Sequence, residues 1–554
     1  MLKLLKKQYP YQNGLQSIRI LAKKVQWQSS NADFVHISDG IGPKLLKHCA
    51  IALYQPLHHL FCESLAQQII PFEWRTHLIK PIFKTGDRSS VKNYRPISLL
   101  CVTSKVLEKI VYNHIIEFVT NNISVSQFGF LRNLSTLQQL LIFINTVNDS
   151  LNSNSQADVL YLDFKKAFDS VAHNELLFKL WSFGITGNLW RWLQAYLSNR
   201  VQQVSVNNTV SDVLPVVSGV PQGSILGPIL FLVFVNDIPA AVSSSLVLLF
   251  ADDAKCIKSV SQTSDCLSFQ QDLNNLVTWS TTWNLPFNDQ KCSMVRFYTN
   301  HSPLQYNYHL NSVPVAIKTS HTDLGIIVTS DLQWKSHHLY IISKSYKFLG
   351  LLRRVFSSVT CTRAKKILYL SLVRSKLLYC SPIWRPHLLA DIKALENVQR
   401  RATKYILNDH LMDYRHRLVS LSLLPLMMIF EIKDIIFFIK CLKQPSKWFN
   451  ILDFVTFCSG HTRSSTYFKL RHSFSRKNYI RHFYFYRLPR LWNSLPYIDI
   501  HQSESTIKKK LKRFMWSHFI NNFDSDNVCT YHLVCPCAKC SLLPVSYNFD
   551  TSFL

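Results

Sequence analysis

Acidic residues are scarce in this sequence. Its 554 residues include 33 Asp and Glu against 62 Lys and Arg, which gives a formal net charge of +29. So strong a self-repulsion predicts a polyanionic partner, because a bound polyanion would relieve it. Nucleic acid fits best, and an anionic membrane surface is the alternative.

Long apolar runs are missing as well. The longest, around Pro228 to Val235, is interrupted at Asn236 and Asp237, well short of the ~20 residues that a membrane-spanning helix needs. The opening ten residues lack the apolar core and the small-residue cleavage site of a secretory signal. We therefore expect an intracellular chain, in the nucleus, the cytoplasm or both, without a membrane partner.

Internal repeats and low-complexity tracts are absent too, whereas apolar residues are plentiful. Hydrophobic residues make up 47% of the chain and aromatics 13%, enough to bury a core and to exclude wholesale disorder. At this length we expect two to four domains. Ten of the 14 cysteines lie singly between Cys49 and Cys458, and we interpret them as reduced thiols in apolar surroundings.

A first acidic motif follows the apolar run Val159 to Leu162. The run predicts a short buried strand that ends at Asp163, after which the chain turns toward a helix near Val171. Taken alone, an acid at a strand end is usually a turn former or a helix cap.

A second motif places two adjacent acids, Asp252 and Asp253, between two apolar runs, as in a β-hairpin with the acids at its tip. Adjacent carboxylates repel, and burying them is costly unless cations neutralise them. An ordinary Asp-containing hairpin turn would explain the acids, but not the apolar strand that runs directly into them.

These acids have the chemistry of a magnesium site. With Asp163 nearby, they could hold two Mg²⁺ ions about 4 Å apart. Carboxylate oxygens suit Mg²⁺, and no His or Cys at either acid cluster suggests zinc. A third segment, Ser218 to Pro228, holds three glycines and two prolines. It predicts a shaped loop that a ligand could approach closely, and it fits neither a Walker A nor a dinucleotide pattern.

Together the three segments resemble motifs A, B and C of the reverse transcriptases of non-LTR retrotransposons, and they occur in the family's order. Motif A corresponds to 163–169, motif B to Gly-Val-Pro-Gln-Gly-Ser at 219–224 and motif C to Phe-Ala-Asp-Asp at 250–253. Further segments resemble the fingers motif (92–100), motif D (285–297) and the hairpin that grips the primer (324–327). The resemblance covers about 45–515 and is closest in character to jockey and related clades.

The resemblance implies roles for individual residues. Asp163, Asp252 and Asp253 would coordinate catalytic Mg²⁺ or Mn²⁺. Phe168 would lie beneath the incoming sugar and exclude a 2′-hydroxyl; its alternative is a core aromatic. The other candidates are Gln222 and Gly223 for the nucleotide and template, Arg95, Lys80 and Lys84 for the triphosphate, and Lys291 for protonating pyrophosphate. For any single surface Lys or Arg, solvation is the alternative.

The implied fold is α+β, a right-hand polymerase with fingers, an antiparallel-sheet palm, a helical thumb and a basic C-terminal extension. We expect an N-terminal linker remnant (1–45), fingers and palm (46–330), the thumb (331–445) and a basic aromatic region with a Cys cluster (446–554). Elements of this type usually carry an endonuclease domain before the polymerase. The 45 preceding residues are too few for it, so we expect that domain to be missing.

Three features of the second half of the sequence are further candidates for binding nucleic acid or metal. Arg400, Arg401 and Lys404 could track a duplex backbone, with a solvated face as the alternative. The stretch 463–490 interleaves basic and aromatic residues, as in single-strand binding surfaces, with a core beneath a basic surface as the alternative. Near the end lie candidate zinc ligands, one Cys-x₂-Cys pair and a second pair with a wide spacing of five. They are Cys529, Cys535, Cys537 and Cys540, with His532 among them.

The expected function is RNA-directed DNA polymerisation by two-metal nucleotidyl transfer, with an RNA template, a DNA primer and deoxynucleoside triphosphates as partners. A catalytically silent polymerase-fold protein that binds RNA is the alternative, and an RNA-splicing cofactor of the same fold is a third. The intact acids favour the enzyme, because a mere binder has no reason to keep them.

Overall fold

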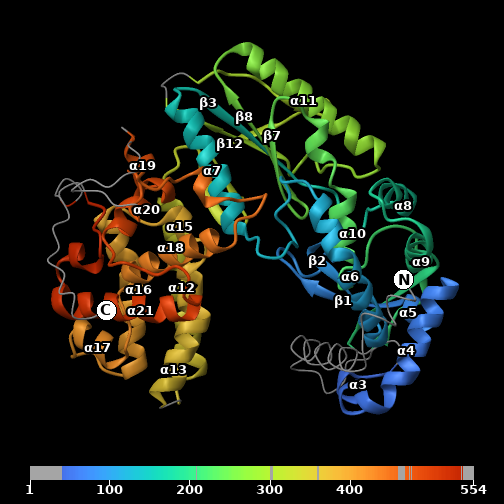
Figure 1. Cartoon of the computed structure of the whole chain (residues 1–554), viewed down its shortest axis with the longest axis horizontal. Coiled ribbons are helices and arrows are strands. Elements are labelled where there is room, and N and C mark those ends of the chain that lie inside the picture. The colour runs from blue at the N-terminus through green and yellow to red at the C-terminus, as the bar shows by residue number, and fades with distance from the viewer. Residues whose placement is uncertain are drawn as a thin grey trace.

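The computed structural model describes residues 40–207, 209–299, 303–358, 361–459, 468–472, 475, 477–537 and 540. Most of the predicted linker at 1–45 therefore lies outside the described residues. Figure 1 shows a sheet between two largely helical regions, with α12 to α21 on one side and α3 to α6 on the other. No helix within the described ranges is both long and apolar enough to cross a bilayer.

A five-stranded central sheet, in the order β12-β9-β3-β8-β7, forms the middle of the molecule. Its central strand β3 (Gln156–Leu162) pairs antiparallel with β8 (Asp253–Val260) and with β9 (Ser293–Phe297). At the edges, β7 (Leu246–Phe250) is antiparallel to β8, whereas β12 (Ala316–Lys318) is parallel to β9. The predicted strand before Asp163 and the predicted acid-tipped hairpin are both present.

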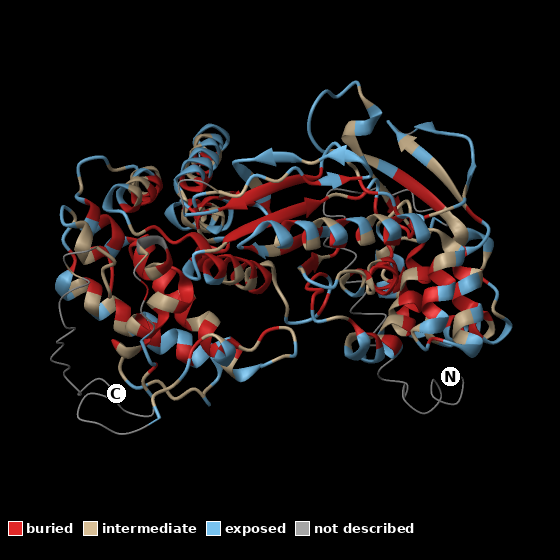
Figure 2. Ribbon diagram, turned by 90° about the horizontal axis from the view of Figure 1, so that it is seen from above, coloured by how far each residue is buried: buried red, intermediate tan, exposed pale blue. Residues whose placement is uncertain are grey.

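The central sheet is buried on both faces. All seven residues of β3 are buried, and Figure 2 shows buried strands in the middle of the molecule. Because side chains alternate along a strand, Val159 and Tyr161 enter one hydrophobic core while Leu160 and Leu162 enter a second. The helices beside the sheet are α7 (Thr136–Asn152), α10 (Gly227–Phe234) and α11 (Thr263–Thr282).

A second sheet lies in the N-terminal half. β1 (Thr76–Phe83) pairs antiparallel with β2 (Tyr94–Leu99) and parallel with β4 (Arg200–Val206), whose other neighbours are β5 (Thr209–Val210) and β6 (Leu214–Val216). The remaining helices of this half are α3 (Pro43–His48), α4 (Ala50–Gln67), α5 (Phe72–Arg75), α6 (Val102–Asn122), α8 (His173–Ser182) and α9 (Gly187–Leu197).

Short elements join these units. One hairpin, β10 (His309–Leu310) with β11 (Val313–Pro314), lies in the chain between β9 and β12, and a second, β13 (Ser320–Asp323) with β14 (Ile326–Thr329), follows β12. The short helical turns are η1 (Val91–Asn93), η2 (Ile238–Ala241), η3 (Tyr369–Arg374), η4 (Ile451–Asp453) and η5 (Val528–Tyr531).

The described residues between 335 and 537 form a helical lobe. Its helices are α12 (Lys335–Val355), α13 (Thr362–Leu368), α14 (Ser375–Leu378), α15 (Ser381–Trp384), α16 (Leu389–Leu407), α17 (Tyr414–Ser420), α18 (Leu426–Lys443), α19 (Asn478–Arg481), α20 (Tyr484–Asn493) and α21 (Glu504–Asn522). The predicted apolar face of α16, with Leu395 and Ala402, is fully buried. Helices α20 and α21 contribute to the same core as α12 to α18, so the described part of 446–554 packs together with 331–445.

Candidate active site

Asp163 follows directly on the last residue of β3. Two hydrogen bonds fix the backbone around it to the segment that precedes β9. Asn288 N–H donates to the Asp163 carbonyl at 2.7 Å, and Lys165 N–H donates to the Pro286 carbonyl at 2.9 Å. These bonds bring the segment that precedes β9 beside the acid. Lys291 from that segment lies with Nζ 3.4 Å from Asp163 Oδ2, so two predicted site residues meet here.

Asp252 and Asp253 lie at the turn between β7 and β8, where Phe250 pairs with Asp253. A neighbouring segment supports the turn from behind. Gln127 Oε1 accepts the backbone N–H of Ala251 at 2.9 Å and that of Gly129 at 2.8 Å. Ala251 adopts a positive φ of 58°, a conformation that costs energy for a residue other than glycine. The hydrogen bond that the Ala251 N–H donates to Gln127 helps to hold this strained turn.

Gly129 is the second support of the acid turn. A Cβ atom at this position would lie 2.2 Å from the backbone nitrogen of Ala251, so only glycine allows the two segments to come this close. Gln127 and Gly129 are not among the residues predicted from the sequence. The available signal was a glycine between the two aromatic residues Phe128 and Phe130, which is weak evidence without the fold.

The three carboxylates influence one another. Desolvation raises the pKa of Asp253 to about 6, with further contributions from the charges of Asp252, Asp323 and Asp163 that Lys255 partly offsets. Desolvation and the Asp163 charge also raise the pKa of Asp252. The Oδ2 atom of Asp163 is buried and accepts no hydrogen bond from any described residue. Surplus negative charge on hard oxygen donors fits divalent cations such as Mg²⁺ or Mn²⁺.

The predicted phosphate-binding cations occupy the β1–β2 hairpin. Arg95 of β2 pairs with Ile82 of β1, and because side chains alternate along a strand, Lys80 and Lys84 lie on the same face as Ile82. The positive charges of Arg95 and Lys84 act on Asp252, whose pKa they lower against the effect of desolvation. Both cations therefore lie near the acids. No interaction of Lys80 with the acids is found among the described residues, and its role stays a prediction.

Phe168 lies on the loop after Asp163, with its ring stacked on Phe231 of α10 at 4.5 Å and edge-on to Phe130 at 6.1 Å between centroids. Phe168 is only partly buried beside the second core. The ring thus has an apolar support on one side and an accessible part on the other. This arrangement agrees with both interpretations of the residue, as a core aromatic and as a steric contact for a ligand.

The glycine-rich loop is tied to the first acidic motif and to β2. Gln222 Nε2 donates to Asp169 Oδ1 at 2.9 Å, and Ser98 N–H donates to the Gln222 carbonyl at 2.8 Å. Gly223 has a positive φ of 132°, and a Cβ atom there would lie 2.4 Å from the Ser98 carbonyl oxygen. Gln222 therefore has a structural partner, and Gly223 is required by the close approach of β2.

In the helical lobe, two of the three cations predicted to track a duplex contact other parts of the chain. Arg400 Nη2 donates to the Ser525 carbonyl and to the Tyr531 hydroxyl, and Arg401 lies 4.7 Å from the Tyr346 ring centroid. Arg400 thus binds the segment 525–531 rather than projecting toward a duplex, whereas a duplex contact of Arg401 and Lys404 stays a prediction. In the basic aromatic stretch 463–490, the residues Phe483 to Phe485 are buried, which favours the alternative of a core. Arg463, Tyr467 and Phe474 of the same stretch lie outside the described residues.

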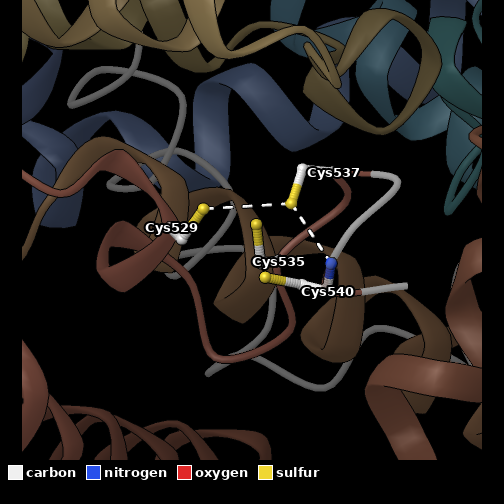
Figure 3. A group of neighbouring side chains, drawn as sticks. All are labelled: Cys529, Cys535, Cys537 and Cys540. Atoms are coloured by element: carbon white, nitrogen blue, oxygen red, sulfur yellow. Dashed lines mark hydrogen bonds between the residues drawn. The ribbon is translucent and has the colours of Figure 1, made fainter. Parts of the chain in front are cut away.

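The four predicted zinc ligands do come together. The sulfur atoms of Cys529, Cys535, Cys537 and Cys540 all lie within 4.8 Å of one another, as Figure 3 shows. His532 does not join them: it is buried beside Arg385, with 3.4 Å between His532 Nδ1 and Arg385 Nη2. A metal can therefore be held by the cysteines alone.

Comparison with known proteins agrees with this geometry. Residues 82–352 match the family described as reverse transcriptase (RNA-dependent DNA polymerase). The chain is similar to three proteins of Drosophila melanogaster: the RNA-directed DNA polymerase from mobile element jockey (31% identical over 52% of this chain), and the probable RNA-directed DNA polymerases from transposon BS (28% over 66%) and from transposon X-element (28% over 61%).

These alignments cover 32%, 42% and 38% of the relatives' own lengths. The chain therefore spans well under half of each relative. Among solved structures, an apo telomerase of Candida tropicalis truncated from its C-terminal domain is matched with a TM-score of 0.34 and 12% identity, over 50% of this chain and 59% of that chain.

Proposed function

We propose that this chain, which contains a domain of the reverse transcriptase family at residues 82–352, is an RNA-directed DNA polymerase of the non-LTR retroelement type. The observation that carries the proposal is the meeting of three acids from two neighbouring strands, with Arg95 and Lys84 close enough to act on one of them. Carboxylates facing cations form a site in which metal ions and a triphosphate can be bound together.

In this proposal the β1–β2 sheet with its helices is the fingers, the central sheet is the palm and the helical lobe is the thumb. Asp163 and Asp252 would hold the divalent ions, Mg²⁺ or Mn²⁺, with Asp253 beside them. Ions held by these carboxylates would supply the charge needed to activate a primer 3′-oxygen and to stabilise the leaving pyrophosphate. The buried Oδ2 of Asp163 accepts no hydrogen bond from a described residue and has the Lys291 ammonium 3.4 Å away, which leaves it available to a metal ion and supports this assignment.

The surrounding side chains would bind and position the nucleotide. Arg95 and Lys84 would hold the triphosphate, Arg through its planar fork of donors. Phe168, supported from behind by Phe231, would present the edge of its ring to the sugar and leave no room for a 2′-hydroxyl. Lys291, which lies beside Asp163, would give its proton to the departing pyrophosphate.

Gln222 would act chiefly through Asp169. Its amide fixes that carboxylate at the end of the first acidic motif, so the glycine-rich loop and the Phe168 loop keep one relative position. A nucleotide bound between them would meet a preorganised surface. The RNA template and the DNA primer are proposed as partners on the same grounds, and the intracellular location stays a prediction.

Primer extension tests the proposal directly. We expect the purified chain to extend oligo-dT on poly-rA in the presence of Mg²⁺ or Mn²⁺, and Asp252→Asn to remove that activity. The competing interpretations, a silent RNA-binding protein and a splicing cofactor, both predict RNA binding without extension. Absence of extension by a folded, RNA-binding chain in both metals would overturn the polymerase assignment.

A further inference from the structure

The last described part of the chain crosses the helical lobe. Residues 523–537, here named the C-terminal strap, contribute Phe523, Tyr531 and Leu533 to the core of the lobe. Arg400 of α16 donates to two oxygen atoms of the strap, the Ser525 carbonyl and the Tyr531 hydroxyl. The strap is thus an integral part of the packing of the lobe.

The strap also completes a buried charge cluster. Glu431 of α18 is fully buried and pairs with Arg385, with 2.8 Å between Arg385 Nη2 and Glu431 Oε1. Its carboxylate accepts two further hydrogen bonds from the strap, from Leu533 N–H at 2.7 Å and from Val534 N–H at 3.2 Å. A buried carboxylate is costly unless its lone pairs are satisfied. Departure of the strap would remove two of the donors to Glu431.

The four cysteines lie at this place, around the end of the strap. Figure 3 shows their side chains turned toward one another. The sulfur atoms of Cys529 and Cys537 are 3.9 Å apart, and all four lie within 4.8 Å. With zinc–sulfur bonds of about 2.3 Å, the edge of a regular tetrahedron of sulfur atoms is roughly 3.8 Å. The observed spacing is thus close to that of a four-thiolate zinc site.

Local structure explains how a wide sequence spacing gives a compact site. Cys529 lies in the short helical turn η5, which Asn527 caps by accepting the Cys529 N–H at 3.1 Å. The turn brings Cys529 back toward Cys537. At the other end, Cys540 N–H donates to Cys537 Sγ at 3.4 Å, an amide-to-sulfur bond of the kind that orients metal-binding thiolates.

We propose that Cys529, Cys535, Cys537 and Cys540 bind one Zn²⁺ ion, and that this ion fixes the C-terminal strap over Glu431. Four thiolates without an open position form a closed, structural site, and soft sulfur ligands select zinc over magnesium. Four thiols lose their protons and four zinc–sulfur bonds form, without any transfer of electrons. The resulting net charge of −2 has a positive neighbour in Arg490 of α20, which interacts electrostatically with Cys535 and Cys540.

Metal content and spectroscopy of the full chain test the first half of the proposal. We expect one zinc per chain by elemental analysis, and a tetrahedral thiolate spectrum after Co²⁺ replacement. Cys537→Ser should lose the metal, whereas Cys361→Ser, at an exposed cysteine outside the cluster, should keep it. Iron in place of zinc, or loss of the same metal from both variants, would overturn the assignment.

Hydrogen exchange tests the second half without any substitution. The Leu533 and Val534 amides, which donate to Glu431, should be protected in the zinc-loaded chain and exchange faster after a chelator removes the metal. Re-addition of Zn²⁺ should restore the protection. If both amides exchange equally slowly with and without metal, the ion does not hold the strap.

The proposal of a zinc site and the proposal of a polymerase site can be refuted independently of each other. Asp252→Asn should retain the zinc and the amide protection while losing primer extension. A chain that binds zinc but never extends a primer would contradict the proposed function and leave the metal site standing. Extension by a chain that contains no zinc would contradict only the metal site.

Discussion

Lys255 and Asp323 form an ion pair that is almost completely sealed from solvent, with side chains 2% and 4% exposed. Lys255 lies on β8, two residues after Asp253, and Asp323 ends β13. The pair therefore connects the hairpin that carries the acids with the β13–β14 hairpin, which contains the segment 324–327 that was predicted to grip the primer. Both charges also act on Asp253, with opposite signs.

Breaking this pair should destabilise the fold. Lys255→Met leaves the Asp323 carboxylate buried without its cation, and we expect a loss of about 3–5 kcal/mol in the free energy of unfolding. The double variant Lys255→Met/Asp323→Leu should regain most of it, since no lone charge remains. Urea unfolding measures both, with Lys318→Met at an exposed position as the control. Equal stability of the single and double variants would contradict the coupling.

Asp252→Asn should abolish primer extension with little effect on RNA binding, because it removes a proposed metal ligand and no core contact. We expect the extension rate to fall by at least roughly tenfold. Asp212→Asn, at an exposed acid between β5 and β6, is the matched control and should extend primers normally. Extension by Asp252→Asn near the unmodified rate would refute the metal assignment.

Phe168→Ala should admit ribonucleotides, since it removes the bulk proposed to lie beneath the 2′ position. The quantity to measure is the ratio of ribonucleotide to deoxynucleotide incorporation. Phe168→Met keeps much of the bulk against Phe231 and serves as the control for packing. An active Phe168→Ala chain with an unchanged ratio would assign this residue to the core alone.

Glu396 of α16 should make the stability of the helical lobe depend on pH. Burial raises its pKa from 4.5 to about 7, so the folded chain binds more protons than the unfolded chain between these values. The free energy of unfolding should therefore fall as the pH rises from about 4.5 to 7, by about 3 kcal/mol in all. Glu396→Gln should flatten this dependence, whereas Glu117→Gln, at an exposed position, should leave it. An equally steep profile in Glu396→Gln would rule out this residue as its source.

Nucleic-acid binding should depend on the exposed cations of α21. Lys509, Lys512 and Arg513 are spaced to share one face of this helix and are exposed. If all three contact a single strand, replacing them with Gln should reduce the slope of log affinity against log salt by about 2. Lys44→Gln/Lys47→Gln in α3, far from α21 in Figure 1, is the control. An unchanged slope would place the contacts elsewhere.

The acid-bearing elements could be predicted because the information is local. An apolar run that ends in Asp163, or that surrounds Asp252 and Asp253, indicates a buried strand and its polar end. The support of the acid turn by Gln127 and Gly129 could not be predicted, because more than 120 residues separate Gln127 from Ala251. Charge alone likewise could not show that Arg400 binds the strap.

The cysteine cluster is a second feature that sequence spacing alone could not predict. A spacing of five residues argued against a site, because spacing rules assume a particular turn between the ligands. The η5 helix supplies a different turn and brings Cys529 to Cys537. The sequence could not decide whether the aromatics of α20 form a single-strand binding surface or a core. Basic residues lie among them in the sequence, and only the packing partners in the structure show that the apolar face is buried.

The contact between Gly129 and Ala251 has a consequence at the level of the gene. Every missense change in the Gly129 codon adds at least a Cβ atom, and that atom has no room beside the acid turn. Under the proposed function, a substitution at Gly129 would therefore abolish polymerisation while Asp163, Asp252 and Asp253 all remain intact. Among copies of such an element, this codon would carry information that the three acid codons do not.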